Sequence, residues 1–334
     1  MRGVSRFVVN MLFAGSVVAG LVPASPVCAA AQTGLSLGLD AGYRHDSLDW
    51  NIGGFLSNFG FVDVLSELAW DDLEIYQVRA RSALDLGRTE RIWVPNYFRG
   101  TIGYGWITDG ENRDSDWAGA NRTLEFSRSN NGADDGNVFD LSIGTGRKFD
   151  LGKKGFRWAP LIGFSYHEQK LKIVDGTQTL FDKAIVAAIN DMPESAIESP
   201  DLTGLNSSYD TQWWGVWYGL DLEYQATQKL RWLGSLEYHF VDYYAAANWN
   251  LRQDFAQPKS FEHEGDGRGV VVALLGEYAF AQLWSASLGV DYSNWRVEQG
   301  IDRVFLASGE IAATRLNAVN WESFAVTAGL TRRF

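Results

Sequence analysis

The chain has 334 residues, a formal net charge of −12 and a single cysteine, and it contains 14 Trp, 13 Tyr, 19 Phe and 35 Gly. An acidic chain of this kind does not look like a nucleic-acid binder. Beyond the N-terminal region no segment offers about 18 uninterrupted apolar residues, which argues against a helical membrane protein. The heavy aromatic and glycine content is typical of a membrane β-barrel with aromatic girdles, and a large soluble β-sandwich is the alternative.

Residues 1–31 have the pattern of a cleavable signal peptide. Two arginines precede an apolar run at 7–22, which is too short to span a membrane as a helix, and small residues lead up to the expected cleavage site. A lipoprotein signal is the competing interpretation, because Cys28 lies here, although the residues before it make a poor lipobox. Cleavage would leave one predicted domain, 32–334, with no cysteine, 27 basic and 41 acidic residues, and a net charge of −14.

Period-two alternation of apolar and polar residues, which indicates half-buried strands, recurs along the predicted domain. The runs are 35–45, 65–86, 97–107, 137–150, 157–172, 209–224, 230–244, 269–278, 283–295 and 324–334. The gaps between them alternate between short turns and long segments. We expect the long segments to be exposed loops; they cover 46–64, 108–136, 173–208, 245–268 and 296–323. Within the third, residues 181–197 have some helical character.

The last strand ends the chain on an aromatic residue. Phe324, Val326 and Leu330 share one face with the terminal Phe334, and a frayed terminus is the alternative explanation of this pattern. An exported chain that closes in this way is expected to pair its last strand with its first, because lipid cannot satisfy an open sheet edge. The sequence therefore predicts an all-β fold, a transmembrane antiparallel β-barrel of about ten strands with long extracellular loops, in the outer membrane of a Gram-negative bacterium. Its lumen would be too narrow for a wide pore.

Several short motifs, in strand order, resemble the omptins, the ten-stranded outer-membrane endopeptidases. They are residues 65–70 (LSELAW), 113–117 (RDSDW), 139–141 (FDL), 163–166 (GFSY), and 327–330 (TAGL) with the terminal Phe334. The resemblance covers nearly the whole predicted domain. It implies the barrel fold, the outer-membrane location and a groove at the outer rim in which a water would be activated between an Asp pair and an Asp–His pair.

Asp114 and Asp116 match the first omptin pair, since they precede Trp117 in an Asp-x-Asp-Trp pattern. Two carboxylates two residues apart on an extended segment point the same way, so they could share one proton and one of their pKa values would rise. That arrangement is usable for acid–base chemistry. A solvated acidic loop tip is the simpler interpretation of the same residues.

The second omptin pair is not matched, because the corresponding segment, 242–250 (DYYAAANWN), contains no histidine. The general base of the expected water attack would then be absent. His239 is predicted to face the lumen but to lie too deep. His263 could reach the rim from the neighbouring strand, and it completes the candidate catalytic set of Asp114, Asp116 and His263. The simpler interpretation of each histidine is a hydrogen-bonded structural residue on a strand.

The resemblance also implies a lipopolysaccharide site. Omptins carry a Tyr-x-Glu-x-Arg pattern on the outer wall, and Tyr166, Glu168 and Lys170 resemble it with Lys in place of Arg. A lysine can meet a phosphate as a point charge, although the bidentate fork of arginine is lost. An interfacial tyrosine beside a snorkelling lysine is the simpler alternative. No Cys/His cluster or Ca²⁺-loop spacing is present, so we expect no metal and no cofactor.

Three hypotheses for function remain open from the sequence. The first is an omptin-like surface protein that is not proteolytic by the omptin mechanism and binds a ligand, a peptide or a protein through its extracellular loops. The second is an endopeptidase with a relocated histidine, and the third is a small channel. Peptide cleavage separates the second from the first, and single-channel conductance identifies the third.

Overall fold

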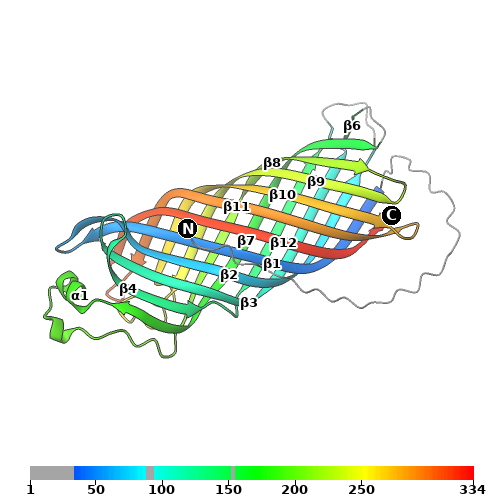
Figure 1. Ribbon diagram of the computed structural model, residues 1–334. Helices are drawn as coiled ribbons and strands as arrows, with labels where there is room; N and C mark the ends of the chain where they lie inside the picture. The colour runs from blue at the N-terminus through cyan, green and yellow to red at the C-terminus, as the bar shows by residue number, and fades with distance from the viewer. Residues whose placement is uncertain (1–33, 88–93, 152–154) are drawn as a thin grey trace, which may run out of the picture.

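The computed structural model describes residues 34–87, 94–151 and 155–334, which form one twisted antiparallel sheet rolled into a barrel (Figure 1). The strands are β1 (Gly34–Leu56), β2 (Gly60–Asp85), β3 (Tyr97–Gly119), β4 (Thr123–Gly132), β5 (Asn137–Gly146), β6 (Phe149–Asp150), β7 (Phe156–Phe181), β8 (Asn206–Gln225), β9 (Leu230–Asn248), β10 (Phe261–Ala279), β11 (Trp284–Phe305) and β12 (Ile311–Arg333). None of the helices in the described ranges is long and apolar enough to cross a membrane.

The barrel closes between its first and last strands, as predicted. β1 pairs with β12 from Ser36↔Arg333 upward, and the Phe334 amide donates to the Leu35 carbonyl at 2.8 Å. β4 and β5 both pair with β3 and with β7, so together they fill one place in the ring. β6 is a two-residue extension beside β7. The ring therefore has ten places, which confirms the prediction of about ten strands.

The lipid-facing band follows from period-two alternation, because successive side chains of a strand point to opposite faces. Leu39 and Leu288 are 65% and 69% exposed on the outer wall, whereas their neighbours Asp40 and Ser287 are buried in the lumen. The buried pair is hydrogen-bonded, with Ser287 Oγ donating to Asp40 Oδ1 at 3.2 Å. Apolar residues outside and hydrogen-bonded polar residues inside are the pattern that a bilayer imposes on a barrel.

Short turns lie at one end of the barrel and longer connections at the other. β8–β9 and β10–β11 are joined by 226–229 and 280–283, whereas the β7–β8 and β9–β10 connections are 182–205 and 249–260. The C-terminus is at the end with the short turns (Figure 1). Because outer-membrane barrels have short periplasmic turns and long extracellular loops, the C-terminal end is periplasmic.

The long segments predicted as loops are mostly strands, which corrects the sequence interpretation. β1 and β2 continue to a hairpin turn at 57–59, β3 continues to Gly119 and pairs with β4, and β11 and β12 continue to a turn at 306–310. The barrel wall thus rises well beyond the lipid-facing band. Above the bilayer the outer face meets water, so both faces carry polar residues and the alternation that marks a membrane strand disappears.

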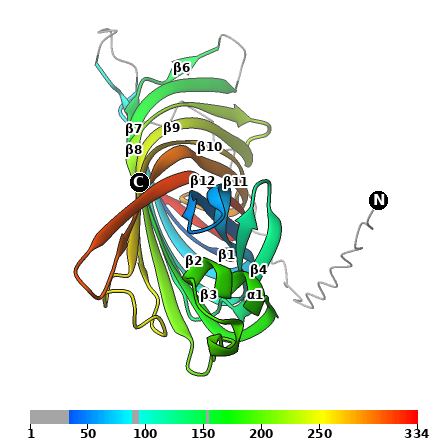
Figure 2. The same cartoon turned by 90° about the vertical axis from the view of Figure 1, so that its left-hand side faces the viewer.

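The helix expected within 181–197 is present as α1 (Lys183–Asn190), followed by a 3₁₀ turn at Glu194–Ala196. Asp182 caps it by accepting hydrogen bonds from the amides of Ala184 and Ile185, which satisfies two orphan donors of the first turn. Figure 2 shows α1 beside β4 at the extracellular end. The predicted signal peptide, 1–31, lies outside the described residues, and the domain boundaries stay predictions.

Candidate functional site

The acidic pair lies on the inner wall of the extracellular extension. On β3, Asp114 stands opposite Leu68 of β2 and Ser129 of β4, and Asp116 stands opposite Ser66 and Ser127. Leu68 is buried in the core of the barrel, so the face that these residues share points inward. The pair is half-buried rather than at a loop tip. The expectation that the two carboxylates point the same way agrees with this register, but their catalytic role stays a prediction.

A shift in the register between β2 and β3 changes which side chains of β3 face the lumen. Lower on the strand, odd-numbered residues such as Ile107 face the lumen, and the β2–β3 register shifts between Asp71 and Ile75. Above the shift the even-numbered residues face inward, beginning with Gly110, whose added Cβ would lie 2.7 Å from a methyl of the buried Leu73. A register shift of this kind is a β-bulge, in which one strand has an extra residue. β-Bulges commonly change the direction of side chains near the rim of a barrel.

The surroundings of the pair disfavour its ionised form. Burial raises the pKa of Asp114 well above its usual value, and the neighbouring charge of Asp116 raises it further. Burial also raises the pKa of Asp116 to about 6, while hydrogen bonds from Ser66 and Ser127 oppose that rise. Burial and the proximity of the two charges therefore both favour the protonated form of the pair.

Arg252 is the basic group that faces this pair. It lies in the β9–β10 connection, and its charge acts on both carboxylates to lower their pKa values. Its guanidinium is already engaged, since Nη2 lies 2.7 Å from Asp254 and the group stacks 4.2 Å from the Phe255 ring centroid. The extracellular mouth thus contains the acid pair on one side and, on the other, an arginine that is already paired with Asp254.

His263 lies on the inner wall of β10 and is completely buried. Its Nδ1 is 2.7 Å from the Tyr209 hydroxyl, which is itself 2.6 Å from the Tyr243 hydroxyl. Its Nε2 lies 3.3 Å from Asp302, whose other oxygen accepts from Thr314 at 2.7 Å. The structure thus brings Asp114 and Asp116 together and gives His263 a separate set of partners. Sequence reasoning had not foreseen the two tyrosines and Asp302.

A packed aromatic cluster, here called the plug, fills the lumen beside His263. It contains inward residues from nearly every wall of the barrel, among them Trp50, Trp70, Tyr209, Trp213, Trp295 and Trp321. Trp295 and Trp321 stack at 5.3 Å, and Gly269 makes room for Trp295, because an added Cβ there would lie 2.3 Å from its ring. The aromatic rings are therefore packed against one another across this level of the barrel.

A polar layer lies beneath the plug, at the upper edge of the lipid-facing band. Asp140 Oδ1 is 2.7 Å from His167 Nδ1, and its Oδ2 accepts from Arg44 Nη1 at 2.7 Å. Nearby, His239 bridges Ser165 at 3.1 Å and Glu237 at 3.0 Å. The prediction that His239 faces the lumen is confirmed. The order Ser165, His239, Glu237 resembles a nucleophilic triad. Ser165 and His239 are both buried, however, so the hydrogen bonds of this layer are suited to stabilising the contacts between strands.

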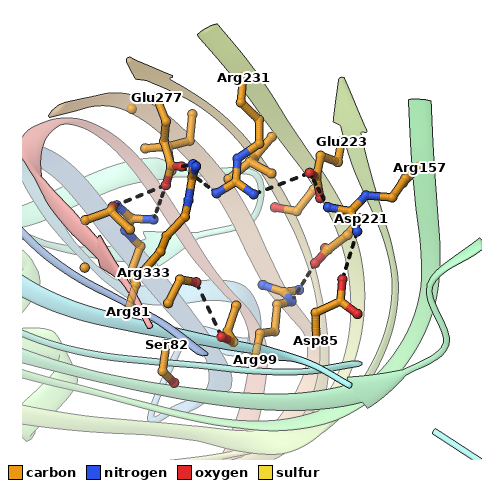
Figure 3. Close-up of a pocket in the computed structure, with 18 of the residues that line it drawn as sticks. Arg81, Ser82, Asp85, Arg99, Arg157, Asp221, Glu223, Arg231, Glu277 and Arg333 are labelled. Atoms are coloured by element: carbon orange, nitrogen blue, oxygen red, sulfur yellow. Dashed lines mark hydrogen bonds and ion pairs between the residues drawn. The ribbon is translucent and has the colours of Figure 1, made fainter. Parts of the chain in front are cut away.

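The lower lumen is a cavity of about 1640 Å³ lined by the periplasmic turns and by charged side chains of many strands. Figure 3 shows these side chains meeting across the space rather than pointing into it singly. Arg231 reaches Glu223 at 3.3 Å and Glu277 at 2.6 Å, and Arg157 joins Asp85 at 2.9 Å. Interlocking ion pairs of this kind fix the strands of a narrow barrel in register. We call this space the periplasmic vestibule.

Tyr166, Glu168 and Lys170 meet on the outer wall of β7. The Tyr166 hydroxyl donates to Glu168 at 2.7 Å, and Lys170 Nζ lies 3.2 Å from the same carboxylate. The lipid-facing Phe164, two residues further down the strand, places the group at the outer edge of the band. The three residues predicted from the motif are therefore in contact, and their lipid ligand stays a prediction.

The described residues contain no group of three or more His, Cys, Asp or Glu side chains arranged to hold a metal ion. Charge is distributed unevenly along the barrel. The extracellular part, residues 44–75, 107–138, 167–215, 241–269 and 293–323, contains 31 acidic and 13 basic residues. The described residues at the periplasmic end, 86–87, 94–96, 147–151, 226–229, 280–283 and 332–334, contain 5 basic and 1 acidic. The two ends therefore differ in the sign of their net charge.

Comparison with solved structures identifies the fold. The outer membrane protease OmpT from Escherichia coli superposes with a TM-score of 0.66 at 14% identity, over 90% of this chain and 97% of that one. The translocator domain of the autotransporter NalP from Neisseria meningitidis gives a TM-score of 0.35 at 11% identity, over 91% and 89%. The attachment invasion locus protein Ail of Yersinia pestis gives 0.26 at 10%, over 91% and 100%. The OmpT match confirms an omptin-like barrel.

No curated protein sequence matches the chain. Residues 38–334 match the profile of a family described as Pom: Protochlamydia outer membrane protein. This match covers nearly all of the described barrel. The chain therefore belongs to the Pom family of outer-membrane proteins, and it is an omptin-like β-barrel of the Gram-negative outer membrane.

Proposed function

We propose that this barrel is a surface protein that binds a cationic peptide or protein at its acidic extracellular mouth and does not cleave it by the omptin mechanism. The observation that carries the proposal is the charge distribution, with 31 acidic against 13 basic residues in the extracellular part. A field of one sign attracts partners of the other and speeds their encounter. Asp114 and Asp116 are inward-facing acids in this part of the barrel, and we take them as the binding site.

The raised pKa values of the pair support cation binding. A buried carboxylate that lacks a full counter-charge gains more from an arriving ammonium or guanidinium than a solvated carboxylate does. Arg252 does not fill this role, since its guanidinium is held by Asp254. A basic side chain entering the mouth would favour loss of a proton from the pair.

The absence of a histidine in 242–250 supports binding without cleavage. Tyr243 and Tyr244 stand in this segment; Tyr243 is buried in the plug, and the Tyr244 hydroxyl donates to Glu262 at 3.2 Å. Their pKa values are raised, chiefly by burial, so neither serves as a base near neutral pH. General-base assistance typically contributes about 10²–10⁴-fold to a rate, and a site without it would turn over feebly.

The test is binding and cleavage measured on one sample. Refolded protein in lipopolysaccharide is mixed with labelled basic peptides, binding is followed by anisotropy, and the peptides are examined by mass spectrometry. We expect intact bound peptide and a loss of about tenfold or more in affinity for Asp114→Asn or Asp116→Asn, the usual scale for a charged hydrogen bond. Glu111→Gln is the matched control, because Glu111 is an exposed acid on the outer face of the same strand. Equal binding by all variants would contradict the proposal.

An endopeptidase that uses Asp114, Asp116 and His263 is the second candidate, supported by the raised pKa values of the acid pair. It requires the plug to open, because His263 is completely buried and hydrogen-bonded to Tyr209. Cleavage that is lost in both Asp116→Asn and His263→Ala would establish it, whereas His239→Ala would affect it only through folding.

A small channel is the third candidate, supported by the size of the periplasmic vestibule. The plug stands between this space and the extracellular mouth, so ion flow requires the aromatic cluster to move. Single-channel recording in planar bilayers tests this. We expect conductance below that of an open ten-stranded lumen, and steady open steps in the wild type would favour the channel.

We further propose that Tyr166, Glu168 and Lys170 bind lipopolysaccharide. Their mutual contacts pre-organise a cation beside an aromatic ring at the level of the lipid headgroups, and the pKa of Lys170 is raised by its hydrogen bond with Glu168, which keeps it charged. A headgroup phosphate would compete with Glu168 for the ammonium.

A further inference from the structure

The last strand ends with two arginines that face opposite sides of the wall. Arg333 points into the periplasmic vestibule, where its guanidinium lies 2.9 Å from Glu277 (Figure 3). Arg332 has the opposite parity and is exposed on the outer wall, in the same row as the lipid-facing Leu330. One arginine is therefore neutralised by the protein, and the other faces the membrane.

The surroundings of Arg332 are apolar and aromatic. Its register partners are Leu37 of β1 and Trp284 of β11, and both are exposed on the outer wall. The Arg332 guanidinium lies 5.6 Å from the Trp284 ring centroid and 4.6 Å from that of Phe334. These two rings fix the cation at the level of the periplasmic girdle, where a long charged side chain can reach the headgroups.

No carboxylate pairs with Arg332 in the part of the chain that the structure describes. Other outward-facing cations differ in this respect: Arg268 is paired with Glu298, and Lys170 with Glu168. A cation on a lipid-facing wall costs free energy unless a counter-charge meets it, and a lipid headgroup at this level can supply one.

The position of Arg332, beside Trp284 on the outer wall at the periplasmic end, points to an anionic headgroup. Basic residues next to a bilayer attract anionic headgroups, each contributing about 1 kcal/mol. We propose that Arg332, braced by Trp284 and Phe334, binds the phosphate of an anionic phospholipid in the periplasmic leaflet. This site is separate from the cationic-ligand site and does not depend on it.

The test is lipid retention by the refolded full-length mature barrel. Detergent micelles doped with phosphatidylglycerol or phosphatidylcholine are mixed with the protein, and retained lipid is counted by native mass spectrometry. We expect phosphatidylglycerol to be retained in preference to phosphatidylcholine, and Arg332→Gln to lower its affinity about fivefold, the factor that corresponds to about 1 kcal/mol. Glycerol phosphate added in excess should not displace it, because a free phosphate lacks the acyl chains that hold the lipid at the wall.

Three further variants make the result decisive. Arg332→Lys keeps the charge and should retain most of the lipid, and Trp284→Leu removes one brace and should weaken retention. Lys229→Gln is the matched control, since Lys229 is a cation at the same end of the barrel that lines the periplasmic vestibule instead of the outer wall. Heat-modifiability confirms that each variant is folded. Equal retention of both lipids, or unchanged retention in both Arg332→Gln and Trp284→Leu, would overturn the proposal, as would displacement by glycerol phosphate.

Discussion

Truncation of Trp295 to alanine tests whether the plug is a packed core. Its side chain is 1% exposed, and its ring centroid lies 4.6 Å from that of His239 and 5.3 Å from that of Trp321. Removing a buried tryptophan typically costs about 3–5 kcal/mol, because the transfer free energy is lost and a cavity remains. Gly269 supports the upper part of this range, since it offers no side chain to fill the space.

The assay is urea unfolding of the refolded barrel, followed by tryptophan fluorescence and by heat-modifiability on gels. With a slope of about 2–3 kcal/mol per M, the midpoint should fall by roughly 1–2.5 M. Trp232→Ala is the control, because Trp232 is a lipid-facing tryptophan that is 40% exposed. Equal shifts for the two variants would refute the conclusion that the extracellular half of the lumen is a close-packed core.

Four further results are expected. Deletion of Phe334 should impair assembly far more than Arg332→Gln, because its amide closes the β1–β12 edge, and pulse-chase appearance of the heat-modifiable form measures this. Lys170→Glu should weaken lipopolysaccharide binding in a pull-down while heat-modifiability stays intact; equal binding would reduce the motif to an interfacial girdle. Basic-peptide affinity should rise about tenfold from pH 5 to pH 7.5, because Asp116 ionises through its raised pKa of about 6, and Asp116→Asn should flatten that profile. Trp295→Ala should raise conductance in planar bilayers above the wild-type level; no change would mean that other plug residues alone close the lumen.

The membrane-spanning part of the fold could be predicted because a bilayer requires apolar side chains on the outer face of each strand, whereas the lumen accepts polar ones. Leu39 faces lipid and Asp40 faces the lumen, so the sequence alternates and the strands can be counted. Above the bilayer the outer face meets water, and this difference between the two faces of a strand is lost. On β3 both the inward Asp114 and Asp116 and the outward Glu111 and Arg113 are polar, so the segment has the composition of a loop although it is a strand.

The plug could not be predicted because composition does not reveal the direction of an aromatic side chain. Trp213 and Trp214 are neighbours in the sequence, yet Trp213 is buried in the plug and Trp214 has the parity of the lipid-facing Val216. The partners of His263 were missed for a related reason. Tyr209 and Asp302 come from other strands, and only the closed ring and its register bring them to one level.

The most direct test of the proposed function is incubation of the refolded protein, in lipopolysaccharide, with a library of peptides graded in charge. Bound and free peptides are separated and sequenced by mass spectrometry. We predict that basic peptides are retained intact and that Asp114→Asn and Asp116→Asn reduce their retention, while Glu111→Gln does not. Efficient cleavage that is abolished by either Asp116→Asn or His263→Ala would contradict this account and identify the protein as a protease.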